Sequence, residues 1–289
     1  MNDRECTEFL QWALPRLGLR WPGYRKVRRL VGKRLAKRLR ELGITDLARY
    51  RARIEHDAAE RAVLDALCRI PISRFYRDRG TFDALRQIVL PRLAARASAG
   101  GRTWLRAWSA GCAAGEEPYT LRLVWDLEMQ RRFPAIALEI TATDVEPAML
   151  RRARTGCYSA GSLRELPPTW LPIAFGQQGR LRCLRESFRA GVEFVEQDIR
   201  VAMPEGVFDL VLCRNLVFTY FAPDVQRGVA ERLIGHLAPG GVLAIGIHEH
   251  LPAGLEALRP LASAPGWHER IPLTDERTPH AVSHGQSPA

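Results

Sequence analysis

Between residues 103 and 247 the sequence alternates short apolar runs with segments of helical periodicity, and this alternation limits the possible folds more than any other feature. Apolar runs that predict strands lie at 103–108, 138–143, 192–196, 208–213 and 242–247. Helices are expected at 117–129, 147–154 and 223–236. This order predicts an α/β fold with a mostly parallel sheet and helices on both faces. Ligands of such sheets bind at the carboxyl ends of the strands.

Residues 1–90 follow a different pattern, without the alternation that strands require. Leucines recur at helical spacing between residues 30 and 42, and Gly43 follows them as a helix stop. Thr45 is expected to cap a second helix over 46–54, and a third helix is expected over 57–68. Residues 94–102 are small and Gly-rich, which is typical of a linker or of a turn into the first strand. We therefore expect an all-α N-terminal domain at 1–90 and an α/β domain at 91–273.

Residues 158–190 interrupt the alternation of strands and helices. Apolar runs at 171–175 and 181–184 flank Gly176 and Gly179, which predicts a small antiparallel β-subdomain inserted into the sheet domain. The polar residues 274–289 are expected to be disordered.

The positive charge of the chain is concentrated in one segment. The formal net charge is +11, and residues 16–40 contain eleven Lys or Arg and no acid. Subtracting these eleven from the 43 basic residues leaves 32, which balance the 32 acidic residues of the chain. The segment is either the solvated face of an amphipathic helix or a surface for an acidic partner. Charge alone does not separate nucleic acid from protein as that partner.

Several classes of protein are disfavoured by composition. No apolar run approaches the ~20 residues of a membrane-spanning helix, and the acidic N-terminus does not resemble a signal peptide. The six cysteines are scattered, without a CxxC pair or a His/Cys cluster. This pattern favours a reducing cytoplasm and argues against a zinc site or a disulfide framework. We expect a cytoplasmic protein, without membrane insertion and without a metal.

A Gly-rich loop at 109–115 follows the first expected strand and runs into the next helix. Gly111 and Gly115 permit a sharp turn and a close approach to a ligand. Asp144 ends the second strand, where an acid binds a ribose diol in this fold. Asp198 follows the third strand, where a side chain can meet an adenine amine. Together with the turn at 237–241, this order is much more specific than a lone glycine turn.

Two carboxylates, Glu116 and Glu117, stand where the following helix begins. A dinucleotide would place its pyrophosphate at this helix end, and the carboxylates would repel it. The same charges suit S-adenosylmethionine (SAM), which is cationic and has no phosphate. We therefore expect SAM rather than a nicotinamide dinucleotide.

Three motifs resemble the CheR family of chemoreceptor glutamate O-methyltransferases. They are AWSAGCAAGEEPYTL at 107–121, RFYRD at 74–78 followed by Phe82, and FDLVLCRN at 208–215. The resemblance covers nearly the whole chain and implies a class I SAM-methyltransferase fold, Rossmann-like, with a small β-subdomain and a basic N-terminal helix that approaches receptors. It implies that the following residues line the SAM site: Ser73, Arg77, Glu116, Asp144, Asp198, Asn215 and Leu216. Arg77 is expected near the methyl donor and the incoming carboxylate, and Tyr220 is a weaker candidate for orienting that carboxylate.

The sequence departs from the family pattern close to this site. Pro71 replaces an asparagine, and one extra residue lies between Asn215 and the Tyr-Phe pair at 220–221. The pattern Gly-His-Ser-Glu becomes GIHE at 246–249. These changes affect the prediction of the methyl acceptor more than the prediction of the cofactor.

Methylation of glutamates on an acidic helical protein, a chemoreceptor cytoplasmic region, is the leading hypothesis, with the enzyme a monomer. A SAM-dependent methyltransferase for RNA or a small molecule is the first alternative, although the basic segment has few aromatics for base stacking. The second alternative is a SAM-binding module without catalysis. The motifs leave the acceptor and any receptor tail peptide undetermined.

Overall fold

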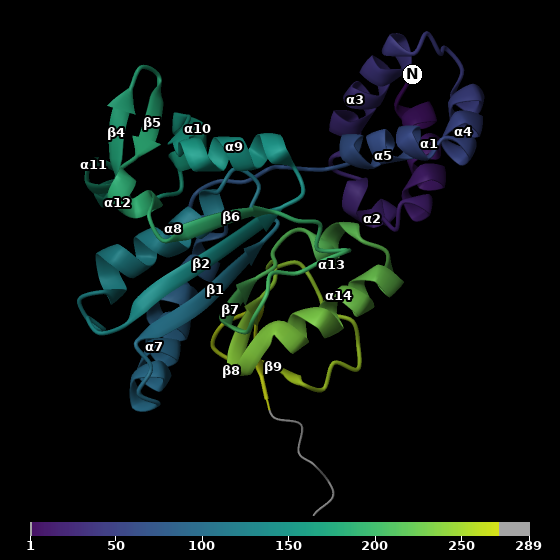
Figure 1. Cartoon of the computed structure of the whole chain (residues 1–289). Coiled ribbons are helices and arrows are strands. Elements are labelled where there is room, and N and C mark those ends of the chain that lie inside the picture. The colour runs from purple at the N-terminus through teal and green to yellow at the C-terminus, as the bar shows by residue number, and fades with distance from the viewer. Residues whose placement is uncertain (1, 272–289) are drawn as a thin grey trace, which may run out of the picture.

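The computed structural model describes residues 2–271, so the tail expected to be disordered from residue 274 lies outside the described residues. Its centre is a seven-stranded sheet in the order β6-β2-β1-β7-β8-β10-β9 (Figure 1). The strands are β1 (Trp104–Ala110), β2 (Ala137–Asp144), β6 (Val192–Glu196), β7 (Phe208–Leu212), β8 (Leu237–Ala244), β9 (Leu258–Pro260) and β10 (Trp267–Arg270). The first five pair in parallel, whereas β10 runs antiparallel to both of its neighbours. The mostly parallel α/β sheet expected from the sequence is confirmed.

Alternate side chains of the central strands enter two hydrophobic cores on opposite faces of the sheet. Ala107 and Leu210 pack with α7 (Leu90–Ala99) and α8 (Glu116–Val124). Trp108 and Val211 pack with α14 (Pro223–His236) and with the N-terminal helices. This period of two places apolar residues on both faces, as a sheet covered on both sides requires. Helix α8 continues as a π-helical turn, η2 (Trp125–Met129), and α9 (Pro147–Thr155) contacts β2 and β6.

The N-terminal region is helical and forms the right-hand part of the molecule in Figure 1. Its helices are α1 (Asp3–Arg16), α2 (Trp21–Tyr24), α3 (Arg28–Glu41), α4 (Leu47–His56) and α5 (Ala58–Leu67). Gly43 adopts φ +64° just after α3, which is the left-handed conformation expected of a helix stop. The cap of α4 is Asp46 and not Thr45, because the Asp46 carboxylate accepts a hydrogen bond from Ala48 N at 3.0 Å.

Residues 94–99 of the segment expected to be a linker or a turn are helical, so the linker prediction was wrong, whereas the turn into the first strand is present at its end. One continuous helical segment ends at Ala99. It consists of α6 (Arg79–Ala84), the π-helical turn η1 (Leu85–Val89) and α7. Leu93, Ala94 and Ala97 are buried against the sheet domain, and small residues permit that close packing. Only Gly100 and Gly101 form the turn into β1. The domain boundary expected at residue 90 stays a prediction.

The inserted β-subdomain has three strands in the order β3-β5-β4. They are β3 (Cys157–Tyr158), β4 (Phe175–Gln178) and β5 (Leu181–Leu184). Four short helical segments complete it: α10 (Ala160–Leu163), η3 (Pro168–Trp170), α11 (Leu171–Ala174) and α12 (Glu186–Arg189). The expected hairpin around Gly179 is present, but residues 171–174 are a helical turn and not a strand.

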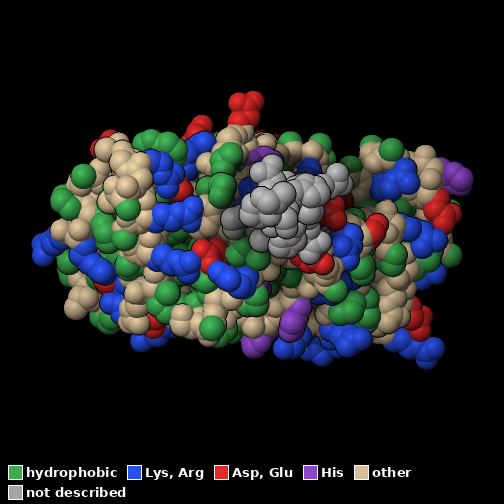
Figure 2. All heavy atoms as spheres, turned by 90° about the horizontal axis from the view of Figure 1, so that it is seen from below, with side chains coloured by type: hydrophobic (Ala, Val, Ile, Leu, Met, Phe, Trp, Pro, Cys, Tyr) green, Lys and Arg blue, Asp and Glu red, His purple; other side chains and the backbone are tan. Residues whose placement is uncertain are grey.

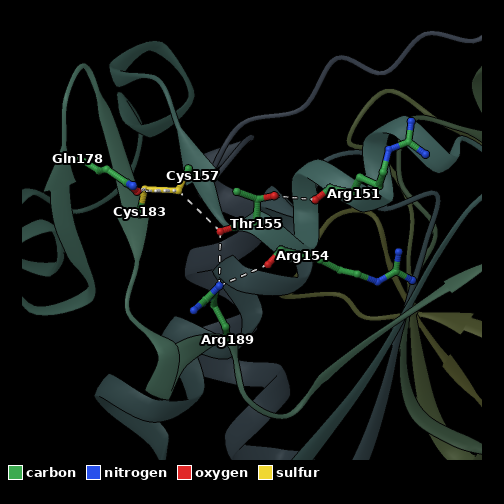
Figure 3. The surroundings of a disulfide bond; sticks show 7 residues. All are labelled: Arg151, Arg154, Thr155, Cys157, Gln178, Cys183 and Arg189. Carbon is green, nitrogen blue, oxygen red and sulfur yellow. Dashed lines mark hydrogen bonds between the residues drawn. A yellow bond between two sulfur atoms is a disulfide. The ribbon is translucent and has the colours of Figure 1, made fainter.

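A disulfide joins Cys157 to Cys183 in this subdomain (Figure 3). The antiparallel register of β3 and β5 places the two cysteines directly opposite each other. The expectation that the cysteines form no disulfide framework is therefore wrong for this pair. The two cysteines are 26 positions apart in the sequence, so the sequence alone does not reveal that they lie on neighbouring strands. The other four cysteines are free and buried. Beside the disulfide, Arg189 donates to the carbonyl oxygens of Arg154 and Thr155 at the end of α9.

Candidate functional site

A cavity of about 390 Å³ lies between the N-terminal helices and the carboxyl ends of β1, β2 and β7. This is the size of a site for a small organic ligand. Gly111, Asp144 and Asn215 reach it from the three strands, and Asp65 and Arg69 reach it from the end of α5. The cavity is therefore at the point where the sheet order switches direction between β1 and β7.

The loop after β1 is shaped by its glycines. Gly111 has φ +74°, and a Cβ there would lie 2.4 Å from Leu216 Cδ2. Gly115 has φ +89°, and a Cβ there would lie 2.9 Å from the Cβ of Ala153 on α9. Side chains are excluded at both positions, since these distances are far below van der Waals contact. Gly111 N donates to Thr143 O at 2.8 Å, which ties the loop to β2.

Among the described residues, four that are not glycine have positive φ, and all of them belong to the walls of this cavity or flank a wall residue. Ala113 and Asn215 line it, and Tyr76 and Asp78 stand on either side of Arg77, which also lines it. Left-handed backbone costs free energy for such residues and persists only where the surroundings hold it. The strained backbone is thus concentrated where ligand contacts are made, as in functional sites.

The two acids expected at the strand ends both line the cavity, and both are engaged. Asp144 accepts hydrogen bonds from Ala113 N at 2.8 Å and from Glu146 N at 2.9 Å. Burial nevertheless raises the pKa of Asp144. Asp198 binds Arg200, with a shortest distance of 2.7 Å. Burial opposes the ionisation of Asp198, but the hydrogen bonds from Arg200 outweigh it and lower the pKa of Asp198.

Gly115 and Glu116 are not in the wall of the cavity, although both were expected at the cofactor site. Glu116 is 3% exposed, and burial raises the pKa of its carboxyl. Glu117 does line the cavity, where it accepts from Ser109 Oγ at 2.8 Å and pairs with Arg214 Nη1 at 3.0 Å. The two glutamates therefore bring less negative charge to the cavity than the sequence indicates.

Arg77 lines the cavity without a carboxylate partner within 4.0 Å among residues 2–271. Its Nη1 donates to Ile72 O at 2.7 Å. The adjacent Asp78 pairs with Arg214 at 2.7 Å instead, so a structural ion pair between Arg77 and Asp78 is excluded. The remaining donors of the Arg77 guanidinium are available to an anionic group in the cavity.

Tyr220 lines the same cavity at the end of α13 (Val217–Tyr220). Its ring packs edge-on against Tyr24 at 5.2 Å between centroids. Burial raises the pKa of Tyr220, while the nearby charge of Arg77 lowers it. The segment is held from the N-terminal side, because Arg20 N donates to Tyr220 O at 2.8 Å.

Of the other expected cofactor residues, Ser73 and Leu216 line the cavity. Pro71, which departs from the family pattern, lines it as well. Sequence reasoning missed Asp65 and Arg69, at the end of α5, and Arg200, in the loop after β6, all of which line the cavity. Arg200 donates to Asp65 at 2.7 and 2.9 Å while it holds Asp198. An Asp-x-Arg spacing at 198–200 is too common to reveal this, and the partner lies 135 positions away.

The basic segment 16–40 divides into two groups. Arg28, Arg34 and Arg38 bind Asp3, the carbonyl of Leu67 and Glu60, at 2.9, 3.1 and 2.7 Å. Exposed basic side chains remain at Arg16, Arg25, Lys26, Arg29, Lys33, Lys37 and Arg40. On the face seen in Figure 2, by contrast, Lys and Arg are spread among acidic and hydrophobic side chains.

The polar groups of the cavity can be compared with the chemistry of SAM. The N-terminus of α8 carries Glu117, which lines the cavity, and the buried Glu116, which does not line it and whose Oε2 has no hydrogen-bond partner within the described chain. A phosphate is disfavoured at such a helix end. Asp144 at the end of β2 presents a carboxylate where ribose hydroxyls bind. These groups fit a cationic nucleoside without phosphate, and together with the sheet order they define a class I SAM-dependent methyltransferase.

Residues 72–264 match the family described as "CheR methyltransferase, SAM binding domain". The chain therefore belongs to the CheR methyltransferase family. A probable chemotaxis protein methyltransferase of Rhizobium etli is 32% identical over 229 residues, which cover 77% of this chain and 84% of that one. A chemotaxis protein methyltransferase of Listeria monocytogenes is 36% identical over 186 residues, covering 64% of this chain and 68% of that one.

A protein of 104.1 kDa from Rhodobacter capsulatus is also similar, at 34% identity over 221 residues. The match covers 76% of this chain but 23% of that protein, so the chain spans about a quarter of it. Among residues 2–271, no helix is both long enough and apolar enough to cross a membrane, and no group of three or more His, Cys, Asp or Glu is arranged to hold a metal ion.

Proposed function

We propose that this enzyme transfers a methyl group from SAM to the side-chain carboxylate of glutamates on a chemoreceptor-like protein in the cytoplasm. The observation that carries the proposal is Arg77, a cavity-lining guanidinium that has no carboxylate partner within residues 2–271. Similarity to chemotaxis protein methyltransferases supports the receptor as acceptor.

The residues that would hold the cofactor are those of the cavity wall: Ser73, Gly111, Asp144, Asp198, Asn215 and Leu216. When bound, SAM supplies an electrophilic methyl group. The chain's own contribution is to exclude water from the cavity and to fix the relative positions of the reacting groups.

Arg77 would hold the incoming carboxylate by charge-assisted hydrogen bonds. A glutamate is already ionised at pH 7, so the acceptor needs no strong general base. Tyr220, which lines the same cavity, would help to orient the carboxylate. The acceptor's negative charge would also be attracted by the exposed basic side chains on α3, such as Arg29, Lys33 and Lys37.

Variants of Arg77 test this role. Arg77→Ala should lower kcat by about 100-fold or more, because orientation of the acceptor is lost, and should change the Kd of SAM less than about threefold. Arg77→Lys should recover little of the activity, since an ammonium lacks the planar pair of donors. Arg131→Ala, at an exposed arginine on the surface, is the control. Equal losses of kcat and SAM affinity in Arg77→Ala would assign Arg77 to cofactor binding instead.

A further inference from the structure

Glu249 is a buried carboxylate just outside the cavity wall. It lies on the loop after β8, is 9% exposed, and is not among the residues that line the cavity. Its Oε2 accepts hydrogen bonds from Asn215 N at 2.8 Å and from Gly246 N at 2.6 Å. Its Oε1 accepts from Thr219 Oγ1 at 2.5 Å. Both oxygens are thus fully engaged by donors of the chain.

These hydrogen bonds hold both ends of the segment 215–219. Asn215 begins the segment with φ +56°, and Thr219 directly precedes Tyr220. Asn215, Leu216 and Tyr220 are the cavity-lining residues of this stretch. Asparagine tolerates left-handed backbone better than most residues with a side chain but also adopts other conformations, so an external contact helps to select this one. The hydrogen bond from Asn215 N to Glu249 supplies such a contact.

The other side of the segment is held by the N-terminal helices. Arg20 Nε donates to Thr219 O at 3.0 Å, and a Cβ at Gly23 would lie 2.3 Å from the same oxygen. Thr219 is therefore enclosed between α2 and Glu249, with its backbone bound on one side and its hydroxyl on the other. The stretch with one residue more than the family pattern is held on both sides.

We propose that Glu249 is a positioning residue, which fixes Asn215 and Tyr220 in the geometry that cofactor and acceptor require. It acts through hydrogen bonds and not through its charge in the reaction, because neither oxygen faces the cavity. The part of the proposal that concerns Tyr220 rests on the proposed function, whereas the part that concerns Asn215 and Leu216 requires only SAM binding.

The hydrogen-bond pattern makes Glu249→Gln a sharp test. A glutamine oxygen can accept from both Asn215 N and Gly246 N, and its amide can donate to Thr219 Oγ1, which also accepts. Glu249→Gln should therefore keep kcat and the Kd of SAM within about threefold. Glu249→Ala leaves two backbone donors without an acceptor and should weaken SAM binding by about tenfold or more. The kcat per SAM-binding molecule should fall further still, by about another tenfold.

A second pair of variants guards against a simple folding defect. Thr219→Val removes the hydroxyl at nearly constant volume, and Thr219→Ser keeps it. We expect Thr219→Val to lower kcat per SAM-binding molecule by about tenfold. Thr219→Ser should have the same kcat per SAM-binding molecule as the unaltered chain. Glu256→Ala, at an exposed glutamate of the same loop region, is the control. All measurements use the full chain, with SAM affinity from calorimetry and active molecules counted by S-adenosylhomocysteine binding.

The outcomes are separable. A Glu249→Gln variant as impaired as Glu249→Ala, and still folded, would show that the charge is required and would overturn the positioning role. An Ala variant with normal SAM affinity and normal kcat per SAM-binding molecule would overturn it as well. If the unaltered chain methylates no receptor, the proposed function fails, and the calorimetric comparison of the Gln and Ala variants still tests Glu249.

Discussion

Arg214 at the end of β7 pairs with Asp78 at 2.7 Å, across 136 positions of the sequence. The Arg214 side chain is 2% exposed, and it also binds Glu117 at 3.0 Å and the carbonyl of Arg77 at 3.1 Å. One buried guanidinium therefore connects the turn that carries Arg77, the start of α8 and the end of β7. The three family motifs of the sequence meet at this residue.

Replacing Arg214 should be strongly destabilising. Arg214→Ala would leave Asp78 and Glu117 without their cation, and breaking a buried ion pair in this way costs about 3–5 kcal/mol. Arg214→Lys should recover only part of the loss, because a lysine does not reproduce the planar fork of donors. Urea unfolding followed by circular dichroism measures the effect. A change below about 1 kcal/mol for Arg214→Ala would contradict the role assigned to this residue.

Arg200 lies outside the three family motifs, but we expect it to affect the affinity for SAM. It binds Asp198 of the cavity wall and Asp65 of α5 at once. Arg200→Ala removes the guanidinium that links the two carboxylates and so loosens the contact between α5 and the loop after β6, so the Kd of SAM should rise about tenfold. Titration calorimetry measures this, with Arg131→Ala as the surface control. Unchanged affinity would mean that the Asp65–Arg200–Asp198 contacts are not needed for the site.

The pH dependence of SAM binding should reveal Asp144. Burial raises the pKa of the Asp144 carboxyl in the folded protein above its ordinary value of 3.8. As the pH falls through the folded pKa, the carboxyl becomes neutral and the affinity for cationic SAM should decrease. Stability should respond in the opposite direction: between the folded pKa and 3.8 the folded state binds more protons, so this carboxyl's contribution to stability rises as the pH falls.

Calorimetry of SAM and of S-adenosylhomocysteine, which lacks the positive sulfonium charge, across mildly acidic pH separates the effect of charge from that of shape. As the pH falls, the affinity for SAM should decrease more than the affinity for S-adenosylhomocysteine. In Asp144→Asn the difference between the two ligands should lose its pH dependence. Parallel pH profiles of both ligands in the unaltered chain would contradict a role of the Asp144 charge.

The disulfide should protect the β-subdomain. Cys157 and Cys183 close a loop across 26 positions, for which the stabilisation is about 3 kcal/mol. Reduction should increase proteolytic cleavage within 157–185, and a thiol reagent should then label these two partly exposed cysteines before the four buried ones. Mass spectrometry of the fragments measures both effects. Labelling of Cys157 in the native, unreduced protein would contradict the pairing.

Reduction of the disulfide should also affect the cofactor loop at 109–115. Tyr158, next to Cys157, donates from its hydroxyl to Ala114 O at 2.8 Å. Its ring also packs edge-on against Phe75, with centroids 4.7 Å apart. The affinity for SAM should therefore fall on reduction by a small factor, about two- to threefold, in the same samples.

Local patterns were sufficient for some elements and insufficient for others. The helix at 223–236 and the strand at 192–196 have the predicted bounds, because apolar periodicity and Pro223 mark them locally. Residues 94–99 resemble a linker because they are small, yet small size is what close packing against the sheet requires. Strands β9 and β10 were missed because they are short; β10 is stabilised by pairing with β8, and β9 by pairing with β10.

The site shows the same division. Ser73, Arg77, Gly111, Asp144, Asp198, Asn215, Leu216 and Tyr220 all line one cavity. What the sequence does not reveal is pairing between distant segments: Arg200 with Asp65, Arg214 with Asp78 and Cys157 with Cys183. Each of these contacts depends on how separate elements pack, and no local spacing encodes it.

The central claim is tested most directly by the chemical nature of the methylated product. The chain is incubated with SAM labelled in its methyl group and with bacterial chemoreceptor cytoplasmic fragments. We predict label on glutamates of the fragment, released as methanol by mild base, and absent with Arg77→Ala. Label that resists base, label on RNA instead of protein, or none on any acidic protein would contradict the assignment as a glutamate methyltransferase.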